Sequence, residues 1–167
     1  METFLISDTH FGHKNIVKFT KDDGSPLRPW DDVEEMNQAL VDNWNSVVGK
    51  HDKVYHLGDA TMDAKSLQWF GSLNGRIILI KGNHDIQKLK YYTPYFDDIR
   101  GAHEVDKLVL THIPIEKHFN SMRYDGNIHG HTHQHNMGDP WYYNVSVEQI
   151  NYTPINFEVV RQHYYQG

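Results

Sequence analysis

Short apolar runs separated by polar turns recur along the whole chain, and this pattern predicts a series of β-strands. The clearest run is the continuous β-branched and leucine stretch at 76–81, which ends at Gly82-Asn83. Other short apolar runs are likewise followed by polar residues or glycine. Strands are therefore predicted at 3–6, 53–57, 76–81, 102–105, 107–111, 127–129, 141–145 and 155–160.

A different spacing of apolar positions predicts helices between some of these strands. From 31 to 48 the apolar residues recur at helical intervals, and Asp31 is placed to cap the start. A short helix is predicted at 63–70, and another is predicted to begin at 86–90. Residues 19–30 are rich in aspartate, glycine and proline and are predicted to form a loop.

The order of these elements predicts an α/β fold. Strands and helices alternate in the first half and strands follow one another in the second, which favours sheets flanked by helices. No repeat or linker divides the chain, and 167 residues suit one domain. We therefore expect a single domain over residues 1–167.

Composition narrows the chemistry. The chain has no cysteine, which excludes disulfides, thiolate zinc sites and cysteine nucleophiles. Its net charge is −6 without a basic block, so binding to long nucleic acid is not favoured. The start lacks the basic residues of a signal peptide and no apolar run approaches the ~20 residues that cross a bilayer, so we expect a cytoplasmic protein.

Thirteen histidines are unusual for this length, and many stand where predicted strands end. The carboxyl ends of strands form the crevice in which open α/β sheets bind ligands, so these clusters are expected to meet there. The clusters that follow strands are Asp8-Thr9-His10, Gly58-Asp59, Gly82-Asn83-His84-Asp85, Thr111-His112 and His129-Gly130-His131-Thr132-His133.

The spacing within each cluster suits metal binding. Residues i and i+2 of an extended backbone point to one side, so Asp8 and His10 can reach the same ion, as can His131 and His133. Asp59 can bridge two ions with its two carboxylate oxygens. Gly58, Gly82 and Gly130 each precede a candidate ligand, where a missing side chain permits close approach.

The ordered series Asp-x-His, Gly-Asp, Gly-Asn-His-Asp, a lone His and Gly-His-x-His resembles the calcineurin-like metallophosphoesterase family, from residue 8 to 133. The run Ser7-Asp8-Thr9-His10-Phe11-Gly12-His13 is similar to its small, cap-less bacterial and phage members. The resemblance implies two mixed β-sheets packed as a sandwich with helices outside, the αββα arrangement of that family.

The resemblance also implies the roles of site residues. One metal would be bound by Asp8, His10, Asp59 and His133, and a second by Asp59, Asn83, His112 and His131. His84 would act as general acid, oriented by Asp85, while metal-bound hydroxide attacks phosphorus. Two divalent metal ions are expected: manganese first, with iron, zinc, nickel or cobalt also suited to nitrogen and oxygen ligands.

Two bound cations would outweigh the two aspartates and attract a phosphate ester to this acidic chain. A helix after Asp85 is predicted to aim its positive end at the same anion. His13 and Arg28 are candidate substrate contacts. His129 and His135 alternate with His131 and His133, and they are expected to be a packed residue and a rim residue.

These features favour a phosphodiesterase of small nucleotides. The alternatives are a phosphomonoesterase or protein phosphatase, and a nuclease, which the acidic balance disfavours. A non-catalytic metal-binding interaction module is the least favoured, because His84 and every ligand position of the family pattern are present.

Overall fold

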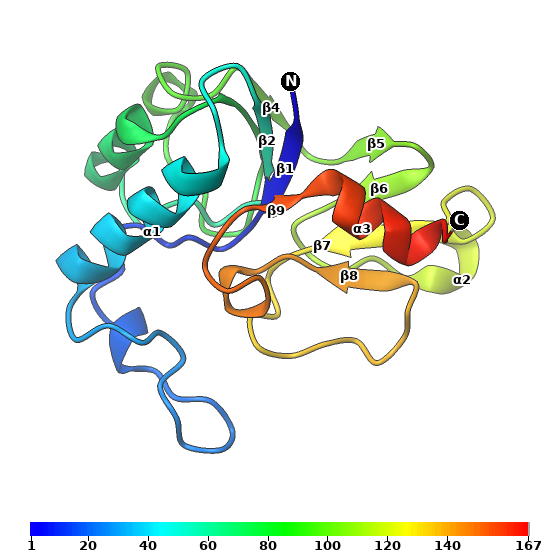
Figure 1. Ribbon diagram of the computed structural model, residues 1–167, viewed down its shortest axis with the longest axis horizontal. Coiled ribbons are helices and arrows are strands. Elements are labelled where there is room, and N and C mark those ends of the chain that lie inside the picture. Colours follow the sequence, from blue (N-terminus) through cyan, green and yellow to red (C-terminus); the bar gives the residue numbers. More distant parts are fainter. Residues whose placement is uncertain (167) are drawn as a thin grey trace.

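The computed structural model describes residues 1–166, and its two β-sheets pack face to face (Figure 1). The first sheet has the strand order β4-β3-β2-β1-β9, and the second has the order β5-β6-β7-β8. The strands are β1 (Thr3–Ile6), β2 (Lys53–His56), β3 (Arg76–Ile80), β4 (Asp98–Arg100), β5 (His103–Val105), β6 (Leu108–Leu110), β7 (Gly126–His129), β8 (Tyr142–Asn144) and β9 (Ile155–Asn156).

Both sheets are mixed. Strands β1 to β4 are parallel, and β9 joins β1 in the antiparallel direction. In the second sheet β6, β7 and β8 are parallel, and β5 is antiparallel to β6. The predicted α/β class, with two mixed sheets and flanking helices, is confirmed.

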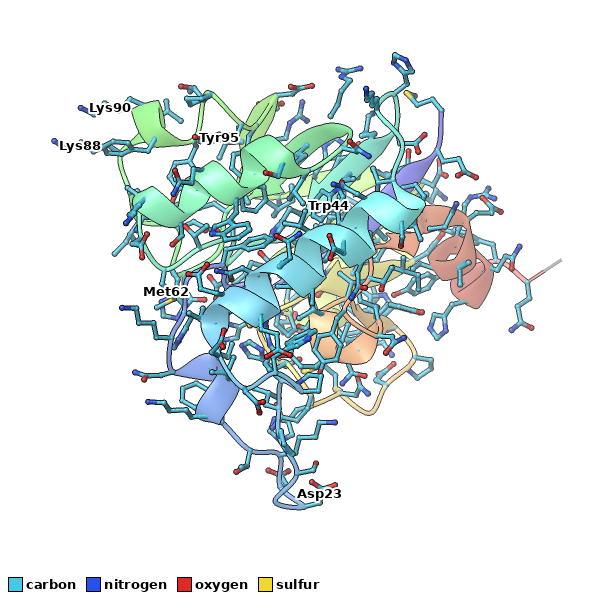
Figure 2. The ribbon with its side chains drawn as sticks, turned by 60° about the vertical axis from the view of Figure 1, so that its left-hand side comes forward. Asp23, Trp44, Met62, Lys88, Lys90 and Tyr95 are labelled. Carbon is cyan, nitrogen blue, oxygen red and sulfur yellow. The ribbon has the colours of Figure 1, made fainter. Side chains whose placement is uncertain are left out.

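The outer face of the first sheet is covered by α1 (Val33–Val47) and the 3-10 helix η2 (Lys65–Ser72). Alternate residues of β1 explain this packing, because Phe4 and Ile6 join the core under α1 while Leu5 points to the opposite face. Trp44 of α1, labelled in Figure 2, is 1% exposed and completes this core. The helix thus buries Met36, Leu40 and Trp44 of the apolar stripe that its sequence spacing predicted, whereas Val47 at its end is 40% exposed.

A second core lies between the two sheets. Leu5 and Ile80 from the first sheet meet Leu110 and Ile128 from the second. Helix α3 (Phe157–Tyr164) contributes Val160 to this core and crosses in front of the second sheet in Figure 1. The two sheets therefore meet in a close-packed apolar core, which positions their strand ends relative to each other.

The predicted strand at 155–160 is wrong beyond its first two residues. The Asn156 side chain accepts a hydrogen bond from the Glu158 N–H at 2.9 Å and starts α3. Val160 is buried while Val159 is 54% exposed, which suits a helix lying on a core. The β-branched residues predicted a strand, but the cap and tertiary packing favour the helix.

Two other predicted helices are 3-10 segments. The segment predicted at 63–70 is η2, and the one predicted after Asp85 is only η3 (Leu89–Tyr91). The expected helix dipole at Asp85 is therefore wrong. The cap of α1 is Asp32 rather than Asp31, because the Asp32 carboxylate accepts the Glu35 N–H at 2.8 Å.

Several short elements were not predicted. Strand β4 lies at a sheet edge, and two of its three residues are charged. The pattern of apolar residues therefore does not predict it. The others are η1 (Ile16–Lys18), α2 (Lys117–Asn120) and η4 (Val147–Gln149).

The predicted loop at 19–30 has neither helix nor strand, apart from an isolated bridge between Thr20 and Pro26. Asp23 lies at the tip of this loop, which projects from the body of the molecule in Figure 2. Among residues 1–166 no helix combines the length and apolarity needed to span a membrane.

Candidate metal centre

Backbone hydrogen bonds bring the carboxyl ends of strands from both sheets to one place. The Asp8 N–H donates to the Gly58 carbonyl at 2.9 Å, which joins the ends of β1 and β2. The Gly130 N–H donates to the His112 carbonyl at 2.9 Å, which joins the segments after β6 and β7. The Val147 N–H donates to the Ser7 carbonyl at 3.0 Å and connects the two sheets. The clusters that the sequence placed after separate strands therefore lie side by side.

The first group of candidate ligands consists of Asp8, His10 and His133. The Asp8 Oδ1 atom lies 3.5 Å from His10 Nε2 and 3.7 Å from His133 Nε2. The other oxygen, Asp8 Oδ2, accepts the Ser7 hydroxyl at 2.6 Å and the His131 N–H at 2.8 Å. One carboxylate oxygen is thus held by the fold while the other faces two imidazoles.

The second group consists of Asp59, His112 and His131, and the Asn83 side chain adjoins it. Asn83 Oδ1 lies 2.9 Å from His112 Nε2 and 3.1 Å from His131 Nδ1. The other ring nitrogen, His112 Nδ1, lies 2.7 Å from the Leu57 carbonyl. This contact fixes the ring with Nε2 toward the other candidate ligands.

Asp59 connects the two groups. Its Oδ2 atom lies 3.6 Å from His10 Nε2 in the first group and 3.3 Å from His112 Nε2 in the second. Its Oδ1 atom accepts the backbone N–H of His84 at 2.9 Å. The carboxylate is therefore placed between the two groups, as a ligand shared by two ions would be.

Unsatisfied buried atoms test whether cations fit these groups. Within residues 1–166, Asp8 Oδ1 and both ring nitrogens of His10 are buried without a hydrogen-bond partner. Buried polar groups nearly always have partners, and Asp8 Oδ1 and His10 Nε2, which face each other at 3.5 Å, would obtain one from a cation bound between them. Ligand atoms ~2.0–2.2 Å from one ion lie roughly 3–3.5 Å apart, close to the separations found here. Nitrogen and oxygen donors without sulfur suit divalent transition metals. The residues fit a two-metal centre.

The backbone at this centre is unusual. Left-handed φ angles are uncommon outside glycine, yet five of the nine non-glycine residues with positive φ among residues 1–166 are candidate ligands. These five are Asp8, His10, Asp59, His131 and His133, with φ between 49° and 68°. Such conformations cost on the order of 1–3 kcal/mol each and persist where the surrounding structure enforces them. The strain is therefore concentrated at the residues that would bind metal.

Two glycines allow the ligand segments to approach. Gly58 has φ of 102°, and a Cβ there would lie 2.6 Å from His112 Nδ1. A Cβ on Gly130 would lie 2.3 Å from Asp8 Oδ2. The predicted reason for glycine before a ligand is thus borne out at both positions.

The electrostatics suit ligation by charged carboxylates. Burial opposes the charge on Asp8, but the neighbouring His10 and His112 rings hold its pKa well below its ordinary value. Burial also disfavours a charged His112 ring, but the Asp59 hydrogen bond and the Asp8 charge raise its pKa to about 9. A cation bound here would take the place of that proton.

The two predicted catalytic residues lie at different depths. His84 is exposed, with its ring centroid 5.8 Å from that of His10. Asp85 is buried, and its carboxylate accepts the N–H groups of Asp59 at 2.8 Å, Ala60 at 3.0 Å and Gly82 at 2.8 Å. Asp85 therefore ties together the segments that follow β2 and β3, and none of its hydrogen bonds within residues 1–166 reaches the His84 ring.

The two predicted substrate contacts also differ. The His13 ring is part-buried beside His10, with centroids 5.6 Å apart, so it borders the first group. Arg28 is 0% exposed, and its guanidinium donates to the Asp8 and Thr9 carbonyls and to Glu148. This buried position does not support the predicted contact between Arg28 and substrate.

The two histidines that alternate with His131 and His133 lie where they were expected. His129 is fully buried against the Tyr142 ring, with Nδ1 2.8 Å from the Gly130 carbonyl. His135 is exposed at the rim, with Nε2 3.0 Å from an Asp22 oxygen.

Sequence reasoning missed Glu148. Its buried carboxylate lies 2.9 Å from His133 Nδ1 and 3.0 Å from Arg28 Nε. Burial alone would raise the pKa of Glu148, but Arg28 and His133 hold that pKa below its ordinary value. No motif marks Glu148, because its partner Arg28 is 120 residues away in the sequence.

Comparison with known proteins identifies the family. The family model of the calcineurin-like phosphoesterase superfamily domain matches residues 1–148. The chain belongs to this superfamily. It is 36% identical to the uncharacterized protein MJ1445 of Methanocaldococcus jannaschii, over 94% of this chain and 88% of that protein. It is also 31% identical to the Gene 66 protein of Mycobacterium phage L5, over 78% of this chain and 77% of that protein.

Solved structures share the fold of this superfamily member. The protein of unknown function AQ665 from Aquifex aeolicus superposes with a TM-score of 0.71 at 28% identity, over 96% of this chain and 98% of that one. An archaeal phosphodiesterase superposes with a TM-score of 0.50 at 22% identity, over 87% of this chain and 82% of that one. The superfamily assignment implies a metal-dependent phosphoesterase that acts on a phosphate ester.

Proposed function

We propose that this protein is a dinuclear-metal phosphodiesterase that hydrolyses small nucleotide phosphodiesters. The observation that carries the proposal is the position of Asp59 Oδ2, within 3.6 Å of a histidine nitrogen from each ligand group. A shared carboxylate of this kind suits a pair of cations that clamp one phosphate ester.

The proposed ligands are Asp8, His10, Asp59 and His133 for one ion, and Asp59, Asn83, His112 and His131 for the other. When bound, two divalent cations supply Lewis-acid activation of water and compensate the charge of the phosphate. We propose manganese as the activating metal, since the donors are nitrogen and oxygen only.

His84 is the proposed general acid. Its backbone N–H is held by Asp59 Oδ1 at 2.9 Å, and its ring stands exposed beside His10. From this position the ring can donate a proton to the departing alkoxide at the open side of the centre. Asp85 supports this arrangement through the backbone amides of Asp59 and Gly82.

His13 is the proposed substrate contact. Its Nδ1 accepts the Ile16 N–H at 3.1 Å, so the proton of the neutral ring is on Nε2. That N–H can donate to a phosphate oxygen beside the first ligand group.

The preference for small diesters rests on the open character of the site. Asn83 and His84 are exposed, so the centre is open to solvent on the side of these two residues. The archaeal phosphodiesterase with the same fold provides a precedent for this class of reaction.

A hydrolysis screen tests the proposal. Metal-free protein is loaded in turn with Mn²⁺, Zn²⁺, Ni²⁺ and Co²⁺ and assayed on bis(p-nitrophenyl) phosphate, p-nitrophenyl phosphate, cyclic nucleotides, dinucleotides and duplex DNA. We expect manganese-stimulated cleavage of the diesters, abolished in Asp59→Asn and retained in the control Asp31→Asn, which changes an exposed aspartate.

The outcomes separate the alternatives. Faster cleavage of monoesters would indicate a phosphomonoesterase or protein phosphatase. Duplex cleavage that falls steeply with salt would indicate a nuclease. Metal binding without hydrolysis of any ester would indicate a non-catalytic module.

A further inference from the structure

A buried ion pair lies directly behind the first ligand group. Arg28, in the loop before α1, donates through Nε to Glu148 Oε2 at 3.0 Å, and both side chains are 0% exposed. Taking two charges out of water is costly unless further hydrogen bonds satisfy them. The additional partners of this pair therefore indicate what it stabilises.

The Glu148 carboxylate fixes the His133 ring. The same oxygen that accepts from Arg28 lies 2.9 Å from His133 Nδ1. His133 Nε2 then faces Asp8 Oδ1 at 3.7 Å. A carboxylate on the outer nitrogen of a ligand histidine fixes its tautomer and raises its basicity toward a metal.

The Arg28 guanidinium fixes the other two ligands of the same group. It donates to the Asp8 carbonyl at 2.6 Å and to the Thr9 carbonyl at 3.0 Å. The segment that it holds includes the left-handed residues Asp8 (φ 61°) and His10 (φ 50°). Hydrogen bonds from a rigid, buried donor can maintain this strained backbone.

The second ligand group lacks this support. Within residues 1–166, Asp59, His112 and His131 make no hydrogen bond to Arg28 or Glu148, and His112 relies on the Leu57 carbonyl instead. The direct contacts of the pair therefore reach the first group, and the second is linked to them only through Asp8 and the shared Asp59.

We propose that Arg28 and Glu148 form a buried brace that positions Asp8, His10 and His133 and sets the metal affinity of the first group alone. Glu148 is a positioning residue that acts through His133, and Arg28 is one that acts through the backbone of Asp8 and Thr9. The proposal rests on the proposed binding of two cations.

Metal titration tests the selectivity of the brace. Isothermal calorimetry with Mn²⁺ is expected to show two ions per wild-type chain. Glu148→Gln should weaken one site by about 10–100-fold and leave the other unchanged. The matched control is Glu158→Gln, which changes an exposed glutamate paired with Arg161 on α3 and should bind both ions normally.

Combining Glu148→Gln with a second substitution, in one ligand group or the other, identifies which metal site is weakened. In His131→Ala, which removes a ligand of the second group, Glu148→Gln should weaken the remaining site by the same factor. In His133→Ala the Glu148→Gln change should have a clearly smaller effect, because the ring that Glu148 contacts is gone and only its pairing with Arg28 remains. Equal losses in both backgrounds would contradict the brace and indicate a general loss of structure.

The tautomer of His133 can be measured in the wild-type protein. Long-range ¹H–¹⁵N correlation spectra of the metal-free protein, recorded where the ring is neutral, should show His133 protonated at Nδ1. Protonation at Nε2 would contradict the proposal. Failure of the wild type to bind Mn²⁺ would contradict the proposed function, whereas unchanged affinity in Glu148→Gln would contradict the brace alone.

Discussion

Two buried histidines close to each other in the fold have opposite surroundings. His56, at the end of β2, is 0% exposed, and its ring is fully paired: Nδ1 accepts the Gly58 N–H at 3.1 Å and Nε2 lies 2.9 Å from the Thr9 hydroxyl. His10, after β1, is 3% exposed, and neither of its ring nitrogens has a partner within residues 1–166.

The difference separates a structural histidine from a proposed metal ligand. A paired buried ring satisfies the fold and has no unused lone pair for a cation. An unpaired buried ring is costly unless something outside the protein chain completes it. Histidine content alone therefore does not mark a metal site. The proposed site is favoured because the unpaired Nε2 of His10 faces carboxylate oxygens of both Asp8 and Asp59.

The largest expected effect comes from removing the ligand shared by the two groups. Asp59→Asn should lower kcat/KM for a phosphodiester by at least roughly a thousandfold, because Lewis-acid stabilisation amounts to several kcal/mol. Steady-state kinetics with saturating Mn²⁺ measures this loss. Activity within tenfold of the wild type would contradict the role of Asp59.

The next effect should depend on the substrate. His84→Asn should slow esters with poor leaving groups by about 10²–10⁴-fold, because a positioned general acid contributes that much. Nitrophenyl esters, whose leaving groups need no proton, should lose far less. Comparing kcat for an alkyl and a nitrophenyl diester of the same phosphate measures the difference, and equal losses would argue against a general acid.

Metal removal should lower stability, since the proposed cation would complete the unpaired atoms of the first group. Mn²⁺ at about 100 times its Kd should raise the free energy of unfolding by about 2.7 kcal/mol per site. Urea unfolding with Mn²⁺ and after chelation measures this change. Identical curves would contradict cation binding to the native state.

Replacing the paired histidine, His56, should lower stability without changing metal binding. His56→Leu leaves the Gly58 N–H and the Thr9 hydroxyl without a partner and should cost about 1–3 kcal/mol of unfolding free energy. The number of Mn²⁺ ions bound should stay at the wild-type value. His51→Leu, at an exposed position, is the control and should change neither quantity. A selective loss of metal in His56→Leu would contradict its structural role.

The smallest expected effect is the loss of unfolding free energy that protonation of His56 causes at low pH. Burial lowers the pKa of His56 to about 3, below its ordinary value of 6.5. Between these two pKa values the His56 ring is protonated in the unfolded chain and neutral in the folded chain. The neutral ring therefore contributes its full stability above pH 6.5, and this contribution is lost as the pH falls toward 3. Urea unfolding at about pH 7 and about pH 5 should show a smaller acid loss in His56→Leu than in the wild type. An equal loss would assign the acid sensitivity to other groups.

Local patterns predicted the elements that position the site. The apolar runs of β1, β2 and β3 are interrupted by polar clusters where each strand ends, so the sequence itself marked the edge at which Asp8, Asp59 and Asn83 meet. The spacing of α1 also predicted the stripe that includes Trp44. These features depend on neighbouring residues, which is why they can be read from the sequence.

Features set by distant contacts could not be predicted in the same way. Glu148 obtains its role from Arg28 and His133, and Asp85 from backbone amides on another segment. The segment after Ile155 has β-branched residues suited to a strand, but Asn156 caps a helix that packs on the core between the sheets. Tertiary contacts decided these cases against the local pattern.

Anomalous diffraction from manganese-loaded crystals would show whether Asp59 joins two cation sites. Two anomalous peaks are expected about 3.5–4 Å apart, with the Asp59 carboxylate between them, His10 beside one peak and His112 beside the other. Peaks remote from Asp59, or a single peak that leaves one of these histidines without metal at saturating Mn²⁺, would contradict this arrangement.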